Sequence, residues 1–338
     1  MAPPTKQLSH EQYTVGWVCA LPKEMVAARA MLDEEHLPLP KPTNDSNTYT
    51  IGRVGDHNVV IACLPMGEIG NSSSAIVATR MTSTFPFIKF GLMVGIGGGV
   101  PKGVRLGDVV VSTPAEGFGG VVQWDFGKTE QGRAFKRTGA LNSPPSVLRT
   151  ALAQLKAMHE MEGPRIPHFL QDMTKKWPKL KQKYVRSNEL EDVLFKPDYN
   201  HVEFEGSDED DEDEHEEETS CIRCDRTRTI RRKPRDMRVH YGLIASGNQV
   251  IKDASFRDEI NKRLGGKVLC FEMEAAGLMN DFPCIVVRGI CDYADSHKNK
   301  AWQEHAAAVA AAMAKELLLV VPAQEVSQLP AVASKLSR

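Results

Sequence analysis

Short apolar runs alternate along the chain with segments in which apolar residues recur every three or four positions. The run at 90–96 is almost continuously apolar, which is typical of a strand buried on both faces of a sheet. The spacing of Val26 and Ala30 after Pro22 is instead typical of a helix. The predicted strands cover residues 13–20, 49–54, 58–64, 90–96, 108–112, 239–245, 267–271 and 284–290. The predicted helices cover residues 23–33, 72–83, 255–264, 273–280 and 302–319.

The order of these elements indicates the fold class. Gly55-Asp56-His57 separates two strands and suits the turn of a β-hairpin. The run at 90–96 leads into Gly97-Gly98-Gly99, which predicts a glycine turn. Strands and helices alternate at both ends of the chain. We therefore expect an α/β protein, with three α/β/α layers around a central mixed β-sheet.

A charged segment interrupts this pattern. Residues 208–218 hold ten acidic residues and one histidine, and residues 223–238 hold eight arginines or lysines. Like-charge blocks bury little apolar surface, so we expect a solvated, mobile insertion within 160–237. An alternative is that the acidic block masks the basic block until a polyanion displaces it. The expected organisation is a single α/β domain at 13–322, with flexible tails at 1–12 and 323–338.

Charge and cysteine content narrow the class of protein. The 338 residues include 42 Lys plus Arg and 44 Asp plus Glu, a net charge of −2, which argues against a nucleic-acid polymer as partner. Seven cysteines in a long chain do not indicate a secreted disulfide framework. The first residues lack an apolar signal core, and Lys315 and Glu316 interrupt the apolar stretch at 306–321. These features predict a cytoplasmic protein that does not bind membranes.

Three carboxylates lie at strand ends or helix starts. Glu24 follows the first strand, Glu274 follows the strand at 267–271, and Asp292 follows the strand at 284–290. Ligands of open α/β sheets bind at the carboxyl ends of strands, so we expect these acids to converge. Three convergent acids suit glycosidic cleavage: one protonates the leaving group, one orients a water and one holds sugar hydroxyls. Taken singly, each acid also fits a helix cap.

The glycine segment at 95–99 differs from a dinucleotide-binding fingerprint. Val100 occupies the last glycine position of G-x-G-x-x-G, and the sequence has no G-x-x-x-x-G-K-[ST] phosphate loop. These features argue against NAD and Walker-type NTP chemistry, and we expect no cofactor. Gly97 and Gly98 either let the backbone approach a ligand closely or let a buried strand turn.

Cys221 and Cys224 form the only C-x-x-C of the sequence. A structural zinc site needs four ligands, and His201, His215 and His240 are the histidines near enough in sequence to complete one. The predicted active site contains no metal. Whether the two cysteines bind zinc stays open on the sequence alone.

Five segments resemble, in this order, the purine and uridine phosphorylase superfamily, particularly its nucleosidase branch. The most specific pieces are Glu-Met-Glu at 272–274 and the pair Cys291-Asp292, where relatives often have Ser-Asp. The match extends over about 13–322. The sequence is most similar to the nucleoside phosphorylase-like domains of fungi, which are found alone or at the N-termini of NOD-like receptor proteins. The five segments are 15–24, 91–112, 241–250, 271–277 and 286–295.

The resemblance implies roles for individual residues. Asp292 would donate a proton toward purine N7, and Glu24 would engage the attacking water. Glu274 would bind the ribose hydroxyls, and Met273 would pack on the sugar. The remaining residues expected to bind substrate are Glu272, Gly97, Gly98, Asn248, Gln249 and Val250, the last replacing an aromatic ring common in relatives.

Hydrolysis and phosphorolysis differ in what holds the nucleophile. A phosphate dianion needs arginine donors, whereas a water needs only an acceptor. Glu24 and Met93 stand where phosphorylase relatives commonly have arginines, which favours hydrolysis, although Arg105 or Arg80 would restore a phosphate site. The predicted function is therefore a purine nucleosidase that acts as a homo-oligomer on small nucleosides. Alternatives are a phosphate-dependent phosphorylase, an effector that cleaves ATP or AMP, and a catalytically silent nucleotide sensor.

Overall fold

The computed structural model describes residues 6–132, 135–188, 190–202 and 221–336. In these residues the main sheet has ten strands in the order β11-β10-β6-β12-β5-β1-β4-β3-β2, with β7 paired to β10. The strands are β1 (Val15–Cys19), β2 (Glu34–Glu35), β3 (Tyr49–Val54), β4 (His57–Cys63), β5 (Phe90–Gly99), β6 (Val109–Ser112), β7 (Val121–Gln123), β10 (Val239–Ser246), β11 (Val268–Glu272) and β12 (Cys284–Asp292). A separate ribbon pairs β8 (Gly127–Lys128) with β9 (Lys136–Arg137).

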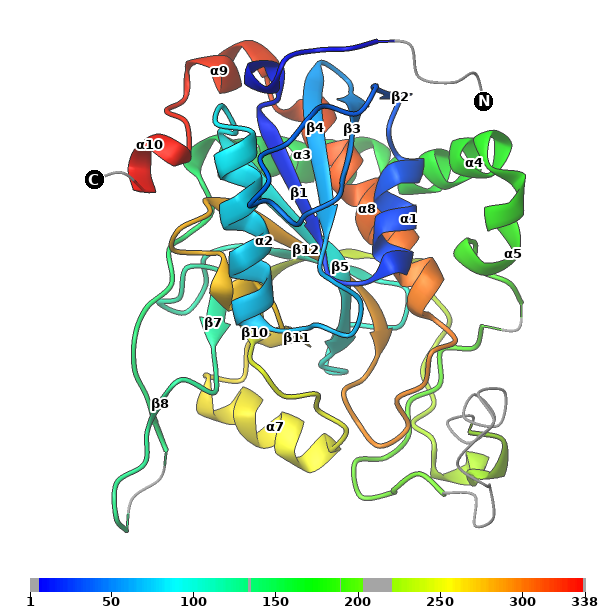
Figure 1. The fold of residues 1–338 in the computed structure, drawn as a ribbon. Coiled ribbons are helices and arrows are strands. Elements are labelled where there is room, and N and C mark those ends of the chain that lie inside the picture. Colours follow the sequence, from blue (N-terminus) through cyan, green and yellow to red (C-terminus); the bar gives the residue numbers. More distant parts are fainter. Residues whose placement is uncertain (1–5, 133–134, 189, 203–220, 337–338) are drawn as a thin grey trace.

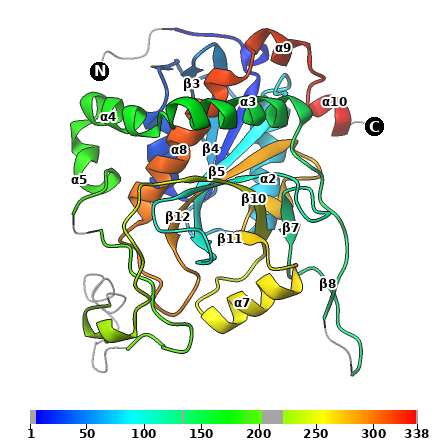
Figure 2. The same cartoon turned by 180° about the vertical axis from the view of Figure 1, so that it is seen from behind.

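Helices cover both faces of this sheet (Figure 1). Trp17 of β1 packs with α1 and α8 on one face, whereas its neighbour Val18 packs with α2 on the other. Seen from behind, α3 and α8 cover the first of these faces (Figure 2). The helices are α1 (Pro22–Ala30), α2 (Asn71–Thr84), α3 (Ser146–Glu162), α4 (Ile166–Lys176), α5 (Lys181–Tyr184), α7 (Ala254–Arg263), α8 (Gln303–Val320), α9 (Ala323–Gln328) and α10 (Ala333–Leu336).

The predicted three-layer α/β class is confirmed, and the sheet is mixed. Strand β5 pairs in parallel with β1 and β12, whereas β12 pairs antiparallel with β6. The alanine-rich helix α8 packs closely on β12, because a Cβ on Gly289 would come within 1.9 Å of the Ala306 carbonyl oxygen. Small residues at this contact bring α8 against the strand that ends at Asp292.

The prediction of a turn at Gly97-Gly98-Gly99 is wrong, because β5 continues through Gly99. This extension pairs in parallel with β12 and antiparallel with β11, where Phe271 lies opposite Gly98. A Cβ on Gly97 would come within 2.9 Å of the Phe271 carbonyl oxygen. The glycines therefore admit a neighbouring backbone rather than a change of chain direction.

The predicted helix at 273–280 is also wrong. Only Ala275–Gly277 is helical, as one 3-10 turn. Side chains take backbone donors that an α-helix would satisfy itself: the Ser246 hydroxyl accepts the N–H of Ala276, and the side-chain oxygen of Asn71 accepts the N–H of Gly277.

The expected charged insertion falls partly outside the described residues, which include none of 203–220. The basic block at 223–238 is described, and parts of it contact the domain. Arg235 pairs with the buried Asp108, and Arg232 donates to Asp192 and to the Tyr293 hydroxyl. The expectation of a solvated block is therefore wrong for these arginines, because the buried Asp108 and the half-buried Asp192 neutralise them.

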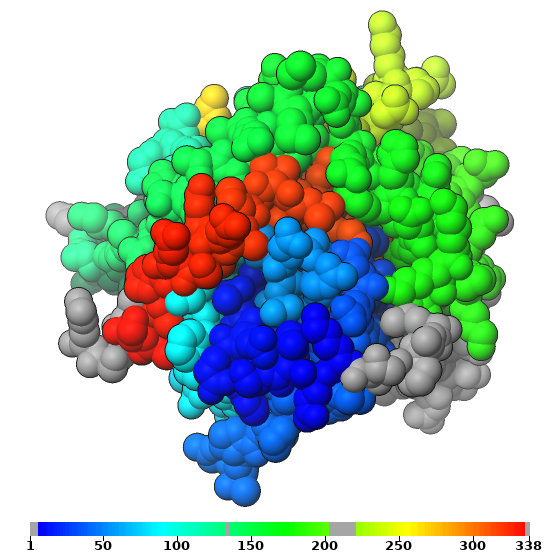
Figure 3. All heavy atoms as spheres, turned by 90° about the horizontal axis from the view of Figure 1, so that it is seen from above, coloured from blue at the N-terminus to red at the C-terminus, as the bar shows by residue number. Residues whose placement is uncertain are grey.

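The C-terminal residues also depart from the expected flexible tail at 323–338. They form α9 and α10 and lie across the top of the molecule, beside α3 and the N-terminal strands (Figure 3). Val332 is buried and donates its N–H to the Ile88 carbonyl, and Lys89 donates to the Leu329 carbonyl at 2.7 Å. In the described part of the chain, no helix combines the length and apolar character needed to cross a bilayer.

Candidate active site

A buried arginine stands at the centre of the candidate site. Arg288 lies in the middle of β12 and is 1% exposed. Its Nη2 donates to Glu272 and, at 3.3 Å, to Glu274. Its Nη1 lies 4.0 Å from an oxygen of Glu24. Three carboxylates from distant parts of the chain therefore surround one guanidinium, as a buried cation requires.

Glu24 is held in place by backbone donors. It lies in the first turn of α1, where Pro22 begins the helix. Its Oε2 accepts the N–H groups of Ala20 and Leu21 at 2.7 and 3.0 Å, which caps the helix. Its Oε1 accepts the N–H of Ile96 in β5 at 2.8 Å and faces Arg288. Glu24 is thus both a cap and a member of the cluster.

Glu272 and Glu274 come from the end of β11 and the residues that follow it. The Glu272 carboxylate accepts the N–H groups of Glu274 and Ala275, which, together with Arg288, shapes the turn that carries Glu274. Glu274 accepts the N–H of Gly70 at 3.4 Å. Met273, between the two acids, is half-buried.

The environment of Glu24 and Glu274 favours their protonated forms. Burial raises the pKa of Glu24, although Arg288 and three backbone N–H groups oppose the shift. Burial also raises the pKa of Glu274 to about 7; Arg288 opposes this shift, and Glu272 and Glu24 add to it. A carboxyl that titrates near neutrality is suited to proton transfer and to hydrogen bonding with hydroxyls.

Asp292 ends β12 and is 4% exposed. Its Oδ1 accepts the N–H of Ala294 at 2.8 Å, and its Oδ2 lies 3.1 Å from the Lys298 ammonium. Cys291 donates its thiol to the same Oδ2. Burial alone would lower the pKa of Lys298, but Asp292, Cys291 and Asp295 together outweigh the effect of burial and the pKa is raised. The ion pair orients Asp292.

The glycine end of β5 connects the two halves of the site. A Cβ on Gly95 would lie 2.3 Å from Glu24 Oε1 and 2.6 Å from Arg288 Nη1. A Cβ on Gly98 would lie 2.7 Å from Asp292 Oδ1. Both carboxylates therefore contact one short glycine segment, which makes them neighbours across it.

A cavity of about 570 Å³ opens beside Asp292. Its size suits a small ligand. Cys291, Asp292 and Tyr293 line one side, and Phe195 and Cys221 line another. Glu24, Glu272 and Glu274 are buried and are not among its lining residues.

Of the three residues expected near the base, only Asn248 has its side chain held by a contact to α2. Asn248 is held in the loop after β10: its backbone N–H donates to Asp125 at 2.7 Å, and its side-chain oxygen accepts the N–H of Asn71. Gln249 and Val250 are exposed, Val250 at 50%. The structure brings Asn248 to the N-terminus of α2, next to the Gly70 contact with Glu274, and leaves the other two side chains toward solvent.

Arg80 and Arg105 both form contacts elsewhere. Arg80 is half-buried and donates to the hydroxyl of Ser46. Arg105 donates to the Lys233 carbonyl at 2.7 Å and lies 4.0 Å from Asp192. Met93 is fully buried in the core.

Two charged residues of this site were not found from the sequence. Arg288 lies within a run that the sequence pattern predicts as an apolar strand, and no motif singles out Lys298. A signal for Arg288 was present, because a lone arginine within the apolar run 284–290 needs buried carboxylate partners. Lys298 lies in a loop and had no comparable signal.

Comparisons with known proteins identify the family. The sequence model of the phosphorylase superfamily matches residues 14–168. A protein of Hyaloscypha variabilis, described as a nucleotide-binding leucine-rich repeat (NLR)-like protein, is 45% identical over 326 residues, which are 94% of this chain. These matches confirm the resemblance to the phosphorylase superfamily. The chain spans 30% of the length of that fungal relative.

More distant members of the superfamily match along most of their length. The 5'-methylthioadenosine/S-adenosylhomocysteine nucleosidase of Mycobacterium bovis is 23% identical over 319 residues, covering 91% of this chain and 97% of the relative. The crystal structure of the nucleosidase of that name from Neisseria meningitidis, in complex with methylthio-immucillin-A, has a TM-score of 0.57 at 19% identity. It covers 90% of this chain and 98% of its own. The superfamily fold thus extends over nearly the whole chain.

We expect Glu274→Gln to change stability in a pH-dependent way. The pKa of Glu274 is raised from 4.5 to about 7, so its favourable contribution is full below pH 4.5 and is lost as the pH rises through 7. The corresponding cost at alkaline pH is roughly 3 kcal/mol. Denaturant unfolding should therefore show the variant gaining stability relative to wild type between pH 5 and pH 8. A stability difference between variant and wild type that does not change with pH would contradict a raised pKa of Glu274.

We expect Gly95→Ala to disturb the arginine-centred cluster. The added Cβ would collide with Glu24 and Arg288, and overpacking of this kind costs about 1–3 kcal/mol. Gly103→Ala is the matched control, because a Cβ there meets no atom within 4 Å. The unfolding temperature and the rate of nucleoside cleavage should both fall in Gly95→Ala and stay unchanged in Gly103→Ala. Equal behaviour of the two variants would show that Gly95 does not position these side chains.

Proposed function

We propose that this chain hydrolyses the N-glycosidic bond of purine nucleosides and releases free base and ribose without a cofactor. The observation that carries the proposal is the arginine-centred cluster of Glu24, Glu272 and Glu274, connected to Asp292 through the glycine end of β5. It places several acids with different environments around a short stretch of backbone. Such an arrangement suits acid and base roles in one glycosidic cleavage.

In the proposed reaction, Asp292 acts on the leaving base, and Glu24 and Glu274 act on the water and the sugar. The bond between the sugar carbon and the base nitrogen breaks, and its electron pair leaves with the base. The Asp292 carboxylate takes up a proton from solvent when the nucleoside binds and gives it to the base as the bond breaks. Lys298, 3.1 Å away, then pairs again with the carboxylate that remains. A water attacks the sugar carbon and passes a proton to Glu24. Glu274 accepts hydrogen bonds from the ribose hydroxyls, and Met273 packs on the sugar.

Water suits the nucleophile position better than phosphate does. The only cation that contacts Glu24, Glu272 and Glu274 among the described residues is Arg288, and all three acids already share it. An incoming phosphate dianion would meet an excess of negative charge. Arg80 and Arg105, the two candidate phosphate ligands, form their contacts elsewhere. The charge balance therefore favours hydrolysis.

The relatives support the same class of reaction. The mycobacterial and neisserial proteins are called nucleosidases, and the neisserial structure holds methylthio-immucillin-A. We propose adenosine-, inosine- and guanosine-type nucleosides as the substrates. Asn248, next to the N-terminus of α2, is the residue we propose to read the edge of the purine. We propose substrate contacts for Gly97 and Gly98 as well, because a backbone without Cβ atoms allows close approach.

Product analysis tests this proposal directly. Wild-type protein should release free base and ribose from a purine nucleoside in phosphate-free buffer, at a rate that added phosphate does not raise. Chromatography of the base and a reducing-sugar assay measure the two products. Ribose 1-phosphate as the main product would overturn hydrolysis, and no base release from any purine nucleoside would overturn the enzyme assignment.

A second candidate follows from the fungal relative, which is described as NLR-like and is more than three times as long as this chain. In a receptor, the same site would cleave ATP or AMP as an effector or bind a nucleotide without cleaving it. The conjunction of Glu24, Glu274 and Asp292 favours catalysis over silent binding. Incubation with ATP, AMP and adenosine in parallel separates these functions: adenine release from the nucleotides alone would favour the effector.

A further inference from the structure

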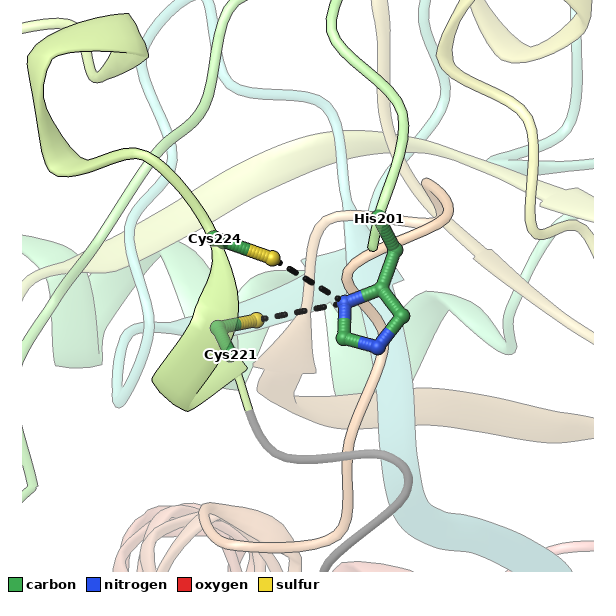
Figure 4. A group of neighbouring side chains, drawn as sticks. All are labelled: His201, Cys221 and Cys224. Atoms are coloured by element: carbon green, nitrogen blue, oxygen red, sulfur yellow. Dashed lines mark hydrogen bonds between the residues drawn. The ribbon is translucent and has the colours of Figure 1, made fainter. Parts of the chain in front are cut away.

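A cluster of two thiols and an imidazole lies outside the acid site. Figure 4 shows Cys221 and Cys224 pointing toward the same ring nitrogen of His201. The sulfur atoms lie 3.8 and 3.3 Å from His201 Nδ1, and the three ligand atoms lie within 4.8 Å of one another. Cys224 is buried, and the other two residues are half-buried.

Hydrogen bonding alone accounts poorly for this convergence. An imidazole nitrogen carries either one proton or one lone pair, so it cannot serve two thiols well at once. A metal ion at the centre would satisfy all three atoms. In tetrahedral zinc with ordinary Zn–S and Zn–N lengths, sulfur and nitrogen ligands lie about 3.6 Å apart. The observed distances of 3.8 and 3.3 Å lie on either side of that value.

We propose that Cys221, Cys224 and His201 bind a zinc ion. The C-x-x-C spacing places Cys221 at the start of one short 3-10 turn, Cys221–Arg223, and Cys224 directly after it, an arrangement that is common in zinc sites. Thiolate and imidazole donors select zinc over magnesium or calcium. Three protein ligands leave one coordination position for a solvent molecule or a further side chain. Of the other two candidate histidines, His240 instead contacts Asp108 at 2.8 Å, and His215 lies outside the described residues.

The position of the cluster gives the zinc a structural role. The backbone N–H of His201 donates to the Ser296 hydroxyl at 3.0 Å, and the Cys221 thiol faces the His297 carbonyl at 3.8 Å. The ring of His297 also stacks on Phe195, with centroids 3.9 Å apart. Zinc would therefore fasten the segments around 195–202 and 221–228 to the loop that follows Asp292. That loop and those segments line the same cavity.

Metal analysis of the full chain tests the proposal. Protein purified with a reductant should contain about one zinc per chain, and Cys221→Ser with Cys224→Ser should hold less than about a tenth of that. His201→Asn should also lose most of the metal. Cys63→Ser and the exposed His168→Asn are the matched controls and should keep it.

Two measurements on wild-type protein remain informative if the cysteine variants fail to fold. Stripped protein titrated with Co²⁺ should show the absorption of a thiolate-ligated tetrahedral ion, which Zn²⁺ then abolishes. Chelation of the zinc should speed tryptic cleavage after Arg223 or Arg226, both exposed. Wild-type protein that binds neither ion at micromolar concentration, or cysteine variants that keep the zinc, would overturn the proposal. A Cys221–Cys224 disulfide in protein kept under reductant would overturn it as well.

Discussion

Asp292→Asn is expected to release base from purine nucleosides about 10²- to 10⁴-fold more slowly than wild type, while the fold stays intact. The amide keeps the shape of the side chain, and its oxygen can still accept the N–H of Ala294. It cannot give up a proton to the leaving base, and it loses the charge that pairs with Lys298. Chromatographic measurement of base release, together with thermal unfolding, separates loss of chemistry from loss of structure.

The matched control for this variant is Asp253→Asn. Asp253 caps α7 by accepting the N–H groups of Ser255 and Phe256, so it makes a similar local contact at an exposed position. Asparagine is also a good helix cap, and we expect turnover close to wild type. Near wild-type turnover by Asp292→Asn, on a substrate whose base needs protonation, would remove Asp292 from the mechanism.

Glu24→Gln is expected to bind nucleoside but to turn it over on the order of 10²-fold more slowly. An ionised Glu24 can accept a hydrogen bond from the attacking water and then its proton, whereas the amide cannot take the proton. Both oxygens of Glu24 accept backbone N–H groups, so one half of the amide will face a donor. We therefore also expect some loss of stability, which thermal unfolding measures.

This variant also separates a hydrolase from a phosphorylase. If phosphate is the nucleophile, wild-type activity saturates with phosphate, and Glu24→Gln helps it by removing a repelling charge. If water is the nucleophile, phosphate has little effect and the variant is slow in every buffer. Glu325→Gln is the control, because Glu325 lies in the first turn of α9 and is exposed. A Glu24→Gln enzyme that is faster in phosphate would overturn hydrolysis and leave Asp292 and Glu274 in their proposed roles.

Local pattern was sufficient for the main elements of the fold. Apolar runs and helical spacing predicted β1, β5, β12, α1 and α8 close to their observed positions, because buried strands and packed helices impose periodicity on their own residues. The ends of those strands placed Glu24, Glu274 and Asp292 at one edge of a sheet. Their shared contacts with Arg288 and the glycine end of β5 agree with that expectation.

Elements that depend on distant partners were not predictable in the same way. Residues 273–280 have a helical pattern, but Ser246 and Asn71 accept two of their backbone N–H groups and only one 3-10 turn remains. Gly97-Gly98-Gly99 reads as a turn, yet it forms a strand because β11 and β12 approach it from either side. Whether such a segment forms the locally favoured conformation or another one depends on which residues from elsewhere in the chain contact its backbone.

The sequence by itself therefore determined the layered α/β class and the main strands, and it gave three acids as candidates, since each follows from local periodicity or from position at a strand end. Only the tertiary structure decided that Arg288 is the shared partner of Glu24, Glu272 and Glu274, and that Lys298 pairs with Asp292. It also decided which histidine meets Cys221 and Cys224. Buried charges and metal ligands are selected by distance in space, and residues far apart along the chain carry no local signal of that distance.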